Sequence, residues 1–285
     1  DIDTLLVNAV ECEPYITSDY RRMIEEPEKV VKGLQVILTL FDSAKGYICI
    51  EDNKPDCIAK MKELVKDIDR IEVKEMMTKY PQGGVRMLIE ALTGRRLNSK
   101  MLPLDVGCIV DNVATVLAIR DAIKYDRPLI STVMTLTGDG VNIPCNVEVP
   151  VGTDFQFIVE SRGGLKENVE KIISGGPMMG SSLISLHIPA VKTSSSILAF
   201  THDEVALNTP TACIRCGRCI DACPGYLIPQ KLYQASLKND INTFIQLNGM
   251  ECIECGCCSY VCPAKRNMTQ AIRKCKSTVA SLKRK

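Results

Sequence analysis

The sequence has no tryptophan, and aromatic residues make up only 5% of its 285 residues. No apolar run approaches the roughly 20 residues that a membrane-spanning helix needs. The two histidines, His187 and His202, lie in no nucleophile or metal motif, and no G-x-G-x-x-G fingerprint is present. The net charge of +1 gives no argument for a nucleic-acid partner. We therefore expect a soluble or peripheral protein whose chemistry does not depend on histidine.

Cysteine, by contrast, is abundant, with 15 residues. Eight of them form two copies of the pattern Cys-x2-Cys-x2-Cys-x3-Cys-Pro. The first copy contains Cys213, Cys216, Cys219 and Cys223, and the second contains Cys252, Cys255, Cys258 and Cys262. Cysteines in this spacing, without a signal-like N-terminus, indicate a reducing cytoplasm rather than a disulfide framework.

The repeated pattern predicts two [4Fe–4S] clusters, and therefore a protein that transfers electrons. In two-cluster ferredoxin modules, the fourth cysteine of each motif ligates the other cluster. We assign to the first cluster Cys213, Cys216, Cys219 and Cys262. We assign to the second cluster Cys252, Cys255, Cys258 and Cys223.

Two alternatives concern these cysteines. Structural zinc usually takes two cysteine pairs separated by a longer spacer, and it is disfavoured because the pattern occurs twice and is followed by proline both times. Cys257, beside Cys258, is either a small packed residue, which we favour, or a replacement ligand.

The segment between the motifs, residues 224–251, has apolar residues at near-helical spacing and predicts helix. Residues 204–285 are therefore expected to form a helical two-cluster domain. From Ala264 onward this domain has basic residues and no acidic ones: Lys265, Arg266, Arg273, Lys274, Lys276, Lys283, Arg284 and Lys285. They form either a solvated helix surface or a docking patch for an acidic carrier or an anionic membrane surface.

Strands and helices alternate over residues 1–126. The expected strands are 4–10, 46–50, 71–73 and 106–110. A polar loop is expected from Glu11, and helices are expected from Pro27, over 55–65 and 85–92, and from Asp111 to about 122. This alternation predicts an α/β fold with a Rossmann-like parallel sheet. In residues 127–203, a hairpin (131–137 and 147–151), a helix (154–161) and two further strands (171–174 and 196–200) predict a β-grasp-like module.

Six motifs, in order, resemble the RnfC family, which supplies one of the subunits of the Rnf electron transport complex. More distantly, they resemble the flavin-bearing NADH dehydrogenase subunit of respiratory complex I. They are Asn8-Ala-Val-Glu-Cys-Glu-Pro14, Tyr80-Pro-Gln-Gly-Gly84, Asp111-Asn-Val-Ala-Thr115, Gly175-Gly-Pro-Met-Met-Gly180, Cys213-Ile-Arg-Cys-Gly-Arg-Cys219 and Ser259-Tyr-Val-Cys-Pro-Ala-Lys265. The resemblance runs along nearly the whole chain. It implies that the β-grasp module is of the soluble-ligand-binding type.

The resemblance also implies a function. NADH would be oxidised, and electrons would pass through FMN and the two clusters to membrane partner subunits and to ferredoxin or another acidic carrier. The chain would then be a component of an ion-translocating NADH:ferredoxin oxidoreductase, peripherally associated with the cytoplasmic membrane.

Six residues are implied as flavin or nicotinamide contacts. Asn8, Glu11 and Glu13 match a polar loop that faces flavin and nicotinamide, Gly83 and Gly84 match a turn beside the isoalloxazine, and Asn112 matches a contact near the flavin phosphate. Polar side chains and glycine-backed amides of this kind orient a flavin and tune its electronics.

Three departures favour an alternative function. The glycine-rich loop expected just before residue 1 is absent, so we expect the first domain to be N-terminally truncated. Val85 stands where relatives usually have Glu, and Val10 stands where complex I has Asp. The alternative is a non-catalytic electron relay that serves a soluble reductase and whose nucleotide site is eroded. The order of the motifs favours the oxidoreductase subunit.

Overall fold

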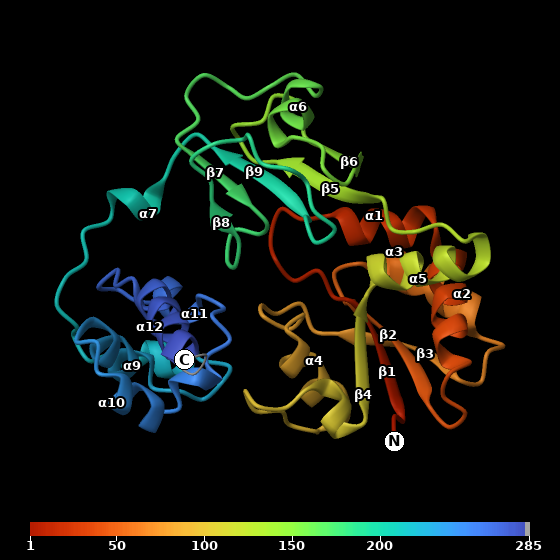
Figure 1. Cartoon of the computed structure of the whole chain (residues 1–285), viewed down its shortest axis with the longest axis horizontal. Helices are drawn as coiled ribbons and strands as arrows, with labels where there is room; N and C mark the ends of the chain where they lie inside the picture. Colours follow the sequence, from red (N-terminus) through yellow and green to blue (C-terminus); the bar gives the residue numbers. More distant parts are fainter. Residues whose placement is uncertain (283–285) are drawn as a thin grey trace. The chain divides into compact units, whose positions relative to one another are not determined.

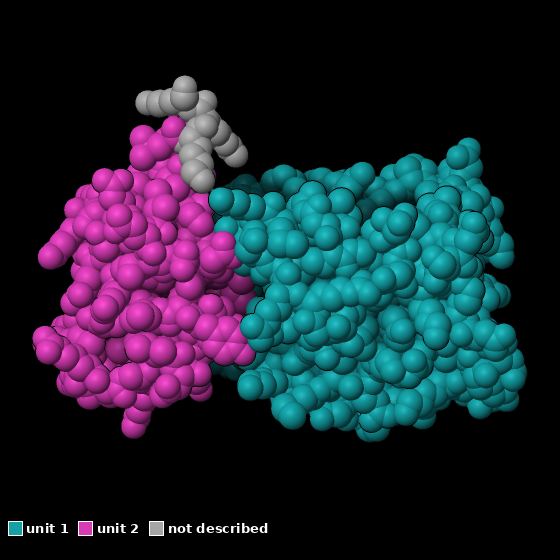
Figure 2. Space-filling view, turned by 90° about the horizontal axis from the view of Figure 1, so that it is seen from below, with its two compact units in different colours: residues 1–202 teal, residues 203–285 magenta. Residues whose placement is uncertain are grey.

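The computed structural model describes residues 1–282, which form two compact units that divide between His202 and Asp203 (Figures 1 and 2). Lys283, Arg284 and Lys285 of the basic C-terminal segment lie outside the described residues. No helix within residues 1–282 is long and apolar enough to cross a membrane.

Unit 1 begins with a parallel sheet of four strands in the order β3-β2-β1-β4. Its strands are β1 (Thr4–Ala9), β2 (Lys45–Glu51), β3 (Ile71–Met76) and β4 (Cys108–Asn112). The helices of this part are α1 (Ser18–Glu25), α2 (Pro27–Leu38), α3 (Pro55–Val65), α4 (Val85–Thr93) and α5 (Val113–Tyr125), with a 3-10 turn, η1, at Pro103–Val106. The predicted Rossmann-like parallel sheet is confirmed.

The strands of this sheet are apolar on both faces because helices cover both. Leu5 and Val7 of β1 belong to the core formed with α2, α3 and α5. Leu6 points to the opposite face, where it packs with Leu88 and Ile89 of α4. Parallel sheets are buried in this way, so their strands appear in sequence as near-continuous apolar runs.

The second part of unit 1 is a mixed sheet with strand order β6-β5-β9-β7-β8. Its strands are β5 (Ser131–Thr137), β6 (Cys145–Pro150), β7 (Lys171–Ser174), β8 (Ser181–Ser182) and β9 (Ser196–Phe200), and its helix is α6 (Phe155–Glu160). β5 and β9 run parallel, while the other pairs are antiparallel. Phe155 and Ile158 of α6 are buried against Met134 and Ile197 of the sheet, as a β-grasp module requires.

Unit 2 is helical. It contains α7 (Glu204–Leu207), α8 (Arg218–Asp221), α9 (Pro229–Leu237), α10 (Ile241–Gln246), α11 (Cys257–Tyr260) and α12 (Met268–Leu282), with a 3-10 turn, η2, at Gly249–Glu251. Leu232, Phe244 and Ile272 form the centre of its core. Gly249 lies so close to Phe244 that an added Cβ would stand 2.3 Å from the ring.

Three local predictions need correction. The segment between the cysteine motifs is helical but divides into α9 and α10, because Asn239 adopts a φ of 52° and Asp240 caps α10 by accepting from the Thr243 amide. The helix expected from Asp111 begins at Val113, where the Asn112 side chain caps it. Helix α1 lies within the stretch that follows Glu11, where the sequence predicts a polar loop.

Candidate functional site

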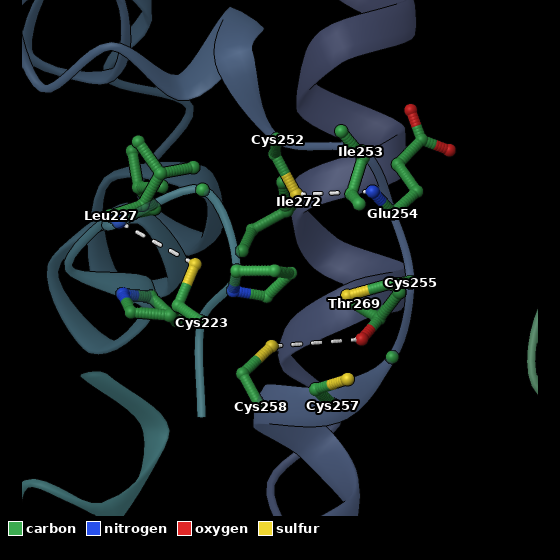
Figure 3. A pocket seen from close by; sticks show the side chains of 15 residues that line it. Cys223, Leu227, Cys252, Ile253, Glu254, Cys255, Cys257, Cys258, Thr269 and Ile272 are labelled. Carbon is green, nitrogen blue, oxygen red and sulfur yellow. Dashed lines mark hydrogen bonds between the residues drawn. The ribbon is translucent and has the colours of Figure 1, made fainter. Parts of the chain in front are cut away.

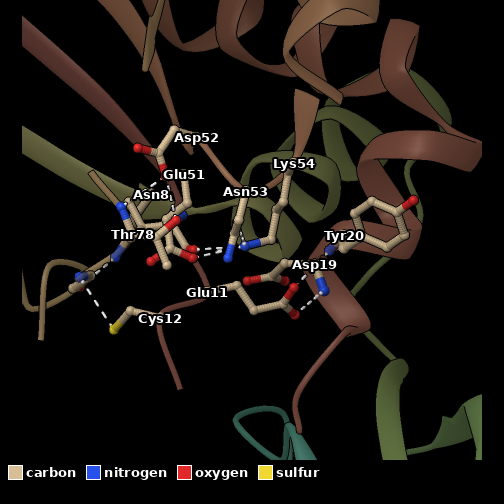
Figure 4. A network of polar contacts seen from close by, with 12 residues as sticks. Asn8, Glu11, Cys12, Asp19, Tyr20, Glu51, Asp52, Asn53, Lys54 and Thr78 are labelled. Atoms are coloured by element: carbon tan, nitrogen blue, oxygen red, sulfur yellow. Dashed lines mark hydrogen bonds and ion pairs between the residues drawn. The ribbon is translucent and has the colours of Figure 1, made fainter. Parts of the chain in front are cut away.

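A cleft lies at the carboxyl edge of the parallel sheet, where β1 and β2 end. Figure 4 shows polar side chains at this edge, among them Glu11, Glu51 and Lys54. It encloses about 840 Å³ and is lined by residues of the segments 11–17, 51–56 and 78–80, together with Tyr20. Open α/β sheets bind ligands at this edge. The volume falls within the range of about 300–1,000 Å³ typical of cofactor and ligand sites.

The structure brings Asn8, Gly83 and Asn112 together at the same edge of the sheet, although none of them lines the cleft. Strand pairing sets Asn8 beside Asn112. Asn8 Nδ2 donates to the Gly83 carbonyl at 2.9 Å, and Asn112 Nδ2 donates to the Asn8 carbonyl at 3.4 Å. Three of the six residues implied as flavin contacts are therefore hydrogen-bonded to one another.

Cys12 contacts the loop that carries Gly83 and Gly84 and holds it in place. The Gly83 amide donates to Cys12 Sγ at 3.4 Å, and a Cβ added at Gly83 would lie 3.1 Å from that sulfur. Gly84 ends the loop as the N-cap of α4. In the same loop, Gln82 Nε2 is a buried donor for which the described part of the chain supplies no acceptor.

Glu11 is turned toward helix α1. Its side chain accepts from the Asp19 amide at 2.7 Å and the Tyr20 amide at 3.1 Å, so it satisfies two of the first amides of that helix. Burial, and then repulsion from Asp19, raise the pKa of Glu11 to about 8. Burial also raises the pKa of Asp19, although its carboxylate accepts from Asn112 Nδ2 at 2.6 Å.

Glu13 is turned toward the loop between β7 and β8. Its Oε2 accepts from the amides of Met178 at 2.9 Å and Met179 at 3.2 Å. A Cβ added at Gly176 would lie 2.0 Å from the same oxygen, so glycine is required for this approach. The motif at residues 175–180 is therefore the partner of a carboxylate that the resemblance assigned to flavin.

Sequence reasoning missed the ion pair of Glu51 and Lys54. Glu51 ends β2 with 2% of its surface exposed, and Lys54 Nζ lies 2.8 Å from its Oε2 and 3.2 Å from the Val10 carbonyl. The signal was present, because an acidic residue directly after the apolar run Tyr47-Ile-Cys-Ile50 is rarely buried without a partner.

The cysteines of unit 2 gather in two pockets. The Cys213 pocket encloses about 310 Å³ and is lined by four of them: Cys213, Cys216, Cys219 and Cys262. The Cys252 pocket encloses about 20 Å³ and is lined by five: Cys223, Cys252, Cys255, Cys257 and Cys258 (Figure 3). Each pocket thus takes three predicted ligands from one motif and the fourth from the other. The ligand assignment itself stays a prediction.

The thiols surround each pocket rather than converge on one point. Among residues 1–282, no three His, Cys, Asp or Glu side chains are arranged to hold a single metal ion. In a cubane each thiolate binds its own iron, so this spread suits the chemistry of a [4Fe–4S] cluster.

The two motifs repeat each other in backbone geometry. The residue two positions after the first cysteine is left-handed in both, with φ of 58° at Arg215 and 61° at Glu254. This conformation aims each amide at a sulfur, at 3.4 Å from Cys213 Sγ and 3.4 Å from Cys252 Sγ. Hydrogen bonds to sulfur of this kind tune the potential of an iron–sulfur cluster.

Comparison with known families gives three matches along the chain. The Nuo51 FMN-binding domain matches residues 1–121, the SLBB domain matches residues 133–181, and the 4Fe-4S dicluster domain matches residues 206–263. The matches follow the order of the two sheets and the helical unit.

Three relatives are the C subunits of closely related complexes. The chain is 46% identical over 231 residues to that of the proton-translocating ferredoxin:NAD(+) oxidoreductase complex of Clostridium ljungdahlii, and 39% identical over 284 residues to that of the Na(+)-translocating complex of Acetobacterium woodii. It is 43% identical over 233 residues to that of the ion-translocating oxidoreductase complex of Yersinia enterocolitica. The chain belongs to this family, RnfC.

The matches cover 81%, 100% and 81% of the chain. They cover 50%, 64% and 33% of the three relatives, so the chain spans about a third to two thirds of their length. Membership of the RnfC family and the matched domains make two [4Fe–4S] clusters and FMN the cofactors of this chain.

Solved structures support the fold. An NAD+-reducing [NiFe]-hydrogenase in the air-oxidized state aligns with a TM-score of 0.63 over 88% of this chain and 47% of its own, at 18% identity. An NAD+-reducing [NiFe]-hydrogenase in the H2-reduced state aligns with a TM-score of 0.64 over 97% of this chain and 56% of its own, at 17% identity. This RnfC-family chain thus shares its fold with a chain of these enzymes.

Proposed function

We propose that this chain is the iron–sulfur electron-transfer subunit of an Rnf-type complex, passing electrons from NADH through FMN and two [4Fe–4S] clusters to membrane partner subunits and ferredoxin. The observation that carries the proposal is the presence, on one chain, of a cleft at the carboxyl edge of the parallel sheet and two pockets that are each lined by cysteines of both motifs. Family membership supports a peripheral place on a membrane complex.

We propose the cluster ligands as the sequence assigns them. The composition of the two pockets supports this crossed set, because Cys262 lines the pocket of the first motif and Cys223 lines that of the second. Cys257 lines the second pocket as a fifth thiol, beside ligand Cys258. Two clusters in one compact helical unit give electrons a short route across it.

The cleft fits a flavin by position, volume and donor chemistry. Asn8, Gly83 and Asn112 hold one another beside the cleft, and Gln82 Nε2 in the same loop is a donor still without an acceptor in the described residues. Lys79 lines the same cleft and supplies a positive charge for a phosphate. When bound, flavin accepts a hydride from NADH and releases its electrons singly.

Glu11 and Glu13 support that cleft indirectly in this proposal. Both carboxylates are already engaged, Glu11 by α1 and Glu13 by the loop at residues 175–180. They hold the walls of the cleft, and they remain within reach of a ligand because they also line it. We further propose three domains, at residues 1–126, 127–203 and 204–285, with the last boundary close to the division between the two compact units.

The test is anaerobic reconstitution with iron, sulfide and FMN, followed by spectra before and after NADH is added. Bleaching of both the flavin and cluster bands is expected. Gly83→Val is the matched variant: its side chain would enter the space of Cys12 Sγ, so flavin retention should fall while the cluster bands remain. Clusters that respond to dithionite alone would overturn the proposal in favour of a relay without nucleotide chemistry.

A further inference from the structure

The Cys213 pocket has a basic rim. Arg215, Lys231 and Arg266 line it, and no acidic side chain does. Helix α8 adds one base, Arg218, and one acid, Asp221, whose charges offset each other. The immediate surroundings of this pocket therefore carry an excess of positive charge.

These rim cations are not neutralised within the part of the chain that the structure describes. No ion pair there involves Arg215 or Lys231. Arg266 stacks over Tyr233, with its guanidinium carbon 4.7 Å from the ring centroid, and donates to the Thr211 carbonyl at 2.9 Å. Their charge remains available to a partner.

Apolar side chains occupy the same rim. Ile214 is 67% exposed, Ile220 44% and Ile228 37%, and all three line the pocket. Cys216 is itself exposed. Apolar groups surrounded by charge are the usual composition of a protein–protein interface, with a water-excluding centre and a polar rim.

The Cys252 pocket differs from the Cys213 pocket in the exposure of its cysteines and in its charge. Its Cys255 and Cys258 are buried. The one charged residue that lines it is an acid, Glu254, which lies 2.8 Å from Arg273 Nε and 2.8 Å from Lys276 Nζ. Of the two cluster sites, the Cys213 pocket is thus the more accessible and the more positive.

We propose that the rim of the Cys213 pocket, formed by Ile214, Arg215, Ile220, Ile228, Lys231 and Arg266, is the docking site of a small acidic electron-carrier protein. The cluster of this pocket is then the one that exchanges electrons with the carrier. One electron leaves the reduced cluster and reduces the oxidised carrier, and no proton or chemical group moves. The inference rests on the proposed function, because both clusters must be assembled.

Charge explains why the carrier is acidic. Unpaired cations around an apolar patch steer an acidic protein toward it and raise association rates by factors of about 10–1,000 at low ionic strength. Salt screens this attraction, because the Debye length falls to roughly 3 Å at 1 M. The isoleucines then exclude water from the contact, which brings the carrier's redox centre near the cluster.

The experiment compares a double charge reversal on the rim of the Cys213 pocket with a single charge reversal outside it. Arg215→Glu combined with Lys231→Glu places acids on the rim, whereas Lys238→Glu changes an exposed lysine at the C-cap of α9 that lines neither pocket. The reconstituted full chain is mixed with an acidic [2Fe–2S] ferredoxin in a stopped-flow instrument. The rate of electron exchange is measured at low ionic strength and at about 0.5 M salt.

The double reversal should slow exchange at least about ten-fold at low ionic strength and remove its salt dependence, while Lys238→Glu stays within about two-fold of the parent. Equal slowing by Lys238→Glu, or no slowing by the double reversal, overturns the docking site. EPR of both clusters checks assembly, and Arg215→Gln with Lys231→Gln replaces the reversals if a cluster is lost. Loss of NADH-dependent bleaching in the parent protein would instead contradict the proposed function.

Discussion

Glu13 accepts a hydrogen bond from the Met178 amide at 2.9 Å, although 165 residues separate them. The bond joins the loop after β1 of the parallel sheet to the loop between β7 and β8 of the mixed sheet. Two parts of unit 1 that each have their own core are thus connected at the edge of the cleft.

Replacing Glu13 with Ala should lower the free energy of unfolding of unit 1 by about 2 kcal/mol, because two amides lose a charged acceptor. Denaturant unfolding followed by circular dichroism measures the change. Glu28→Ala, on the exposed face of α2, is the control and should have little effect. Gly176→Ala should also destabilise, but by less when Glu13 is already Ala, because the clash with its carboxylate is gone. Additive effects would contradict this contact.

Stability should depend on pH through Glu11. Its folded pKa of about 8 exceeds the ordinary 4.5, so the folded state holds the proton more tightly than the unfolded state. The contribution of Glu11 to the free energy of unfolding is fully present below about pH 4.5 and is lost as the pH rises to about 8. Glu11→Gln should therefore flatten the decline in unfolding free energy over this window, by several kcal/mol at about 1.4 kcal/mol per pKa unit.

Asp19 and Lys54 face the same carboxylate, so the measurement needs a comparison. Repulsion from Asp19 raises the pKa of Glu11 and the charge of Lys54 lowers it. Asp19→Asn should bring the Glu11 pKa down and shift the decline to lower pH. Denaturant midpoints between pH 5 and 8 report both variants. If the free energy of unfolding still declines with pH in Glu11→Gln, the decline belongs to another titrating group.

Iron content tests the crossed ligation. If Cys216 and Cys262 hold one cluster, Cys216→Ser with Cys262→Ser should leave about four irons per chain, the content of one [4Fe–4S] cluster. Cys216→Ser with Cys223→Ser should instead damage both clusters. An uncrossed arrangement predicts the reverse pair of results, so the two double variants control each other.

Cys257→Ala should leave both clusters in place. Cys257 lines the Cys252 pocket, but four other cysteines there already satisfy a cubane. Iron content of about eight per chain and an unchanged cluster absorbance are expected. Loss of about half the iron would make Cys257 a ligand.

Local patterns predicted much of the fold. The strands at 131–137, 171–174 and 196–200 and the helix at 55–65 agree with the structure at both ends. Pro55 at the first turn marks the start of α3. The cysteine spacing likewise predicted which thiols would gather.

The remainder depends on contacts that sequence distance hides. Helix α1 begins where Glu11 accepts from its first amides, eight and nine residues further along. The hydrogen bonds of Glu13 depend on the other sheet, and the break between α9 and α10 depends on one left-handed residue, Asn239. Of the residues that the resemblance named, Glu11 and Glu13 line the cleft, and only the structure shows which partners hold them.

The crossing of the two cysteine motifs has a consequence for how the protein is made. A ribosome that has released the first motif has supplied only three sulfurs for the Cys213 pocket, since the fourth belongs to Cys262. Cys223 likewise lines a pocket whose other cysteines belong to the second motif. Neither cofactor can be fully enclosed until the second motif has been synthesised, so the two centres are expected to mature together, after that point.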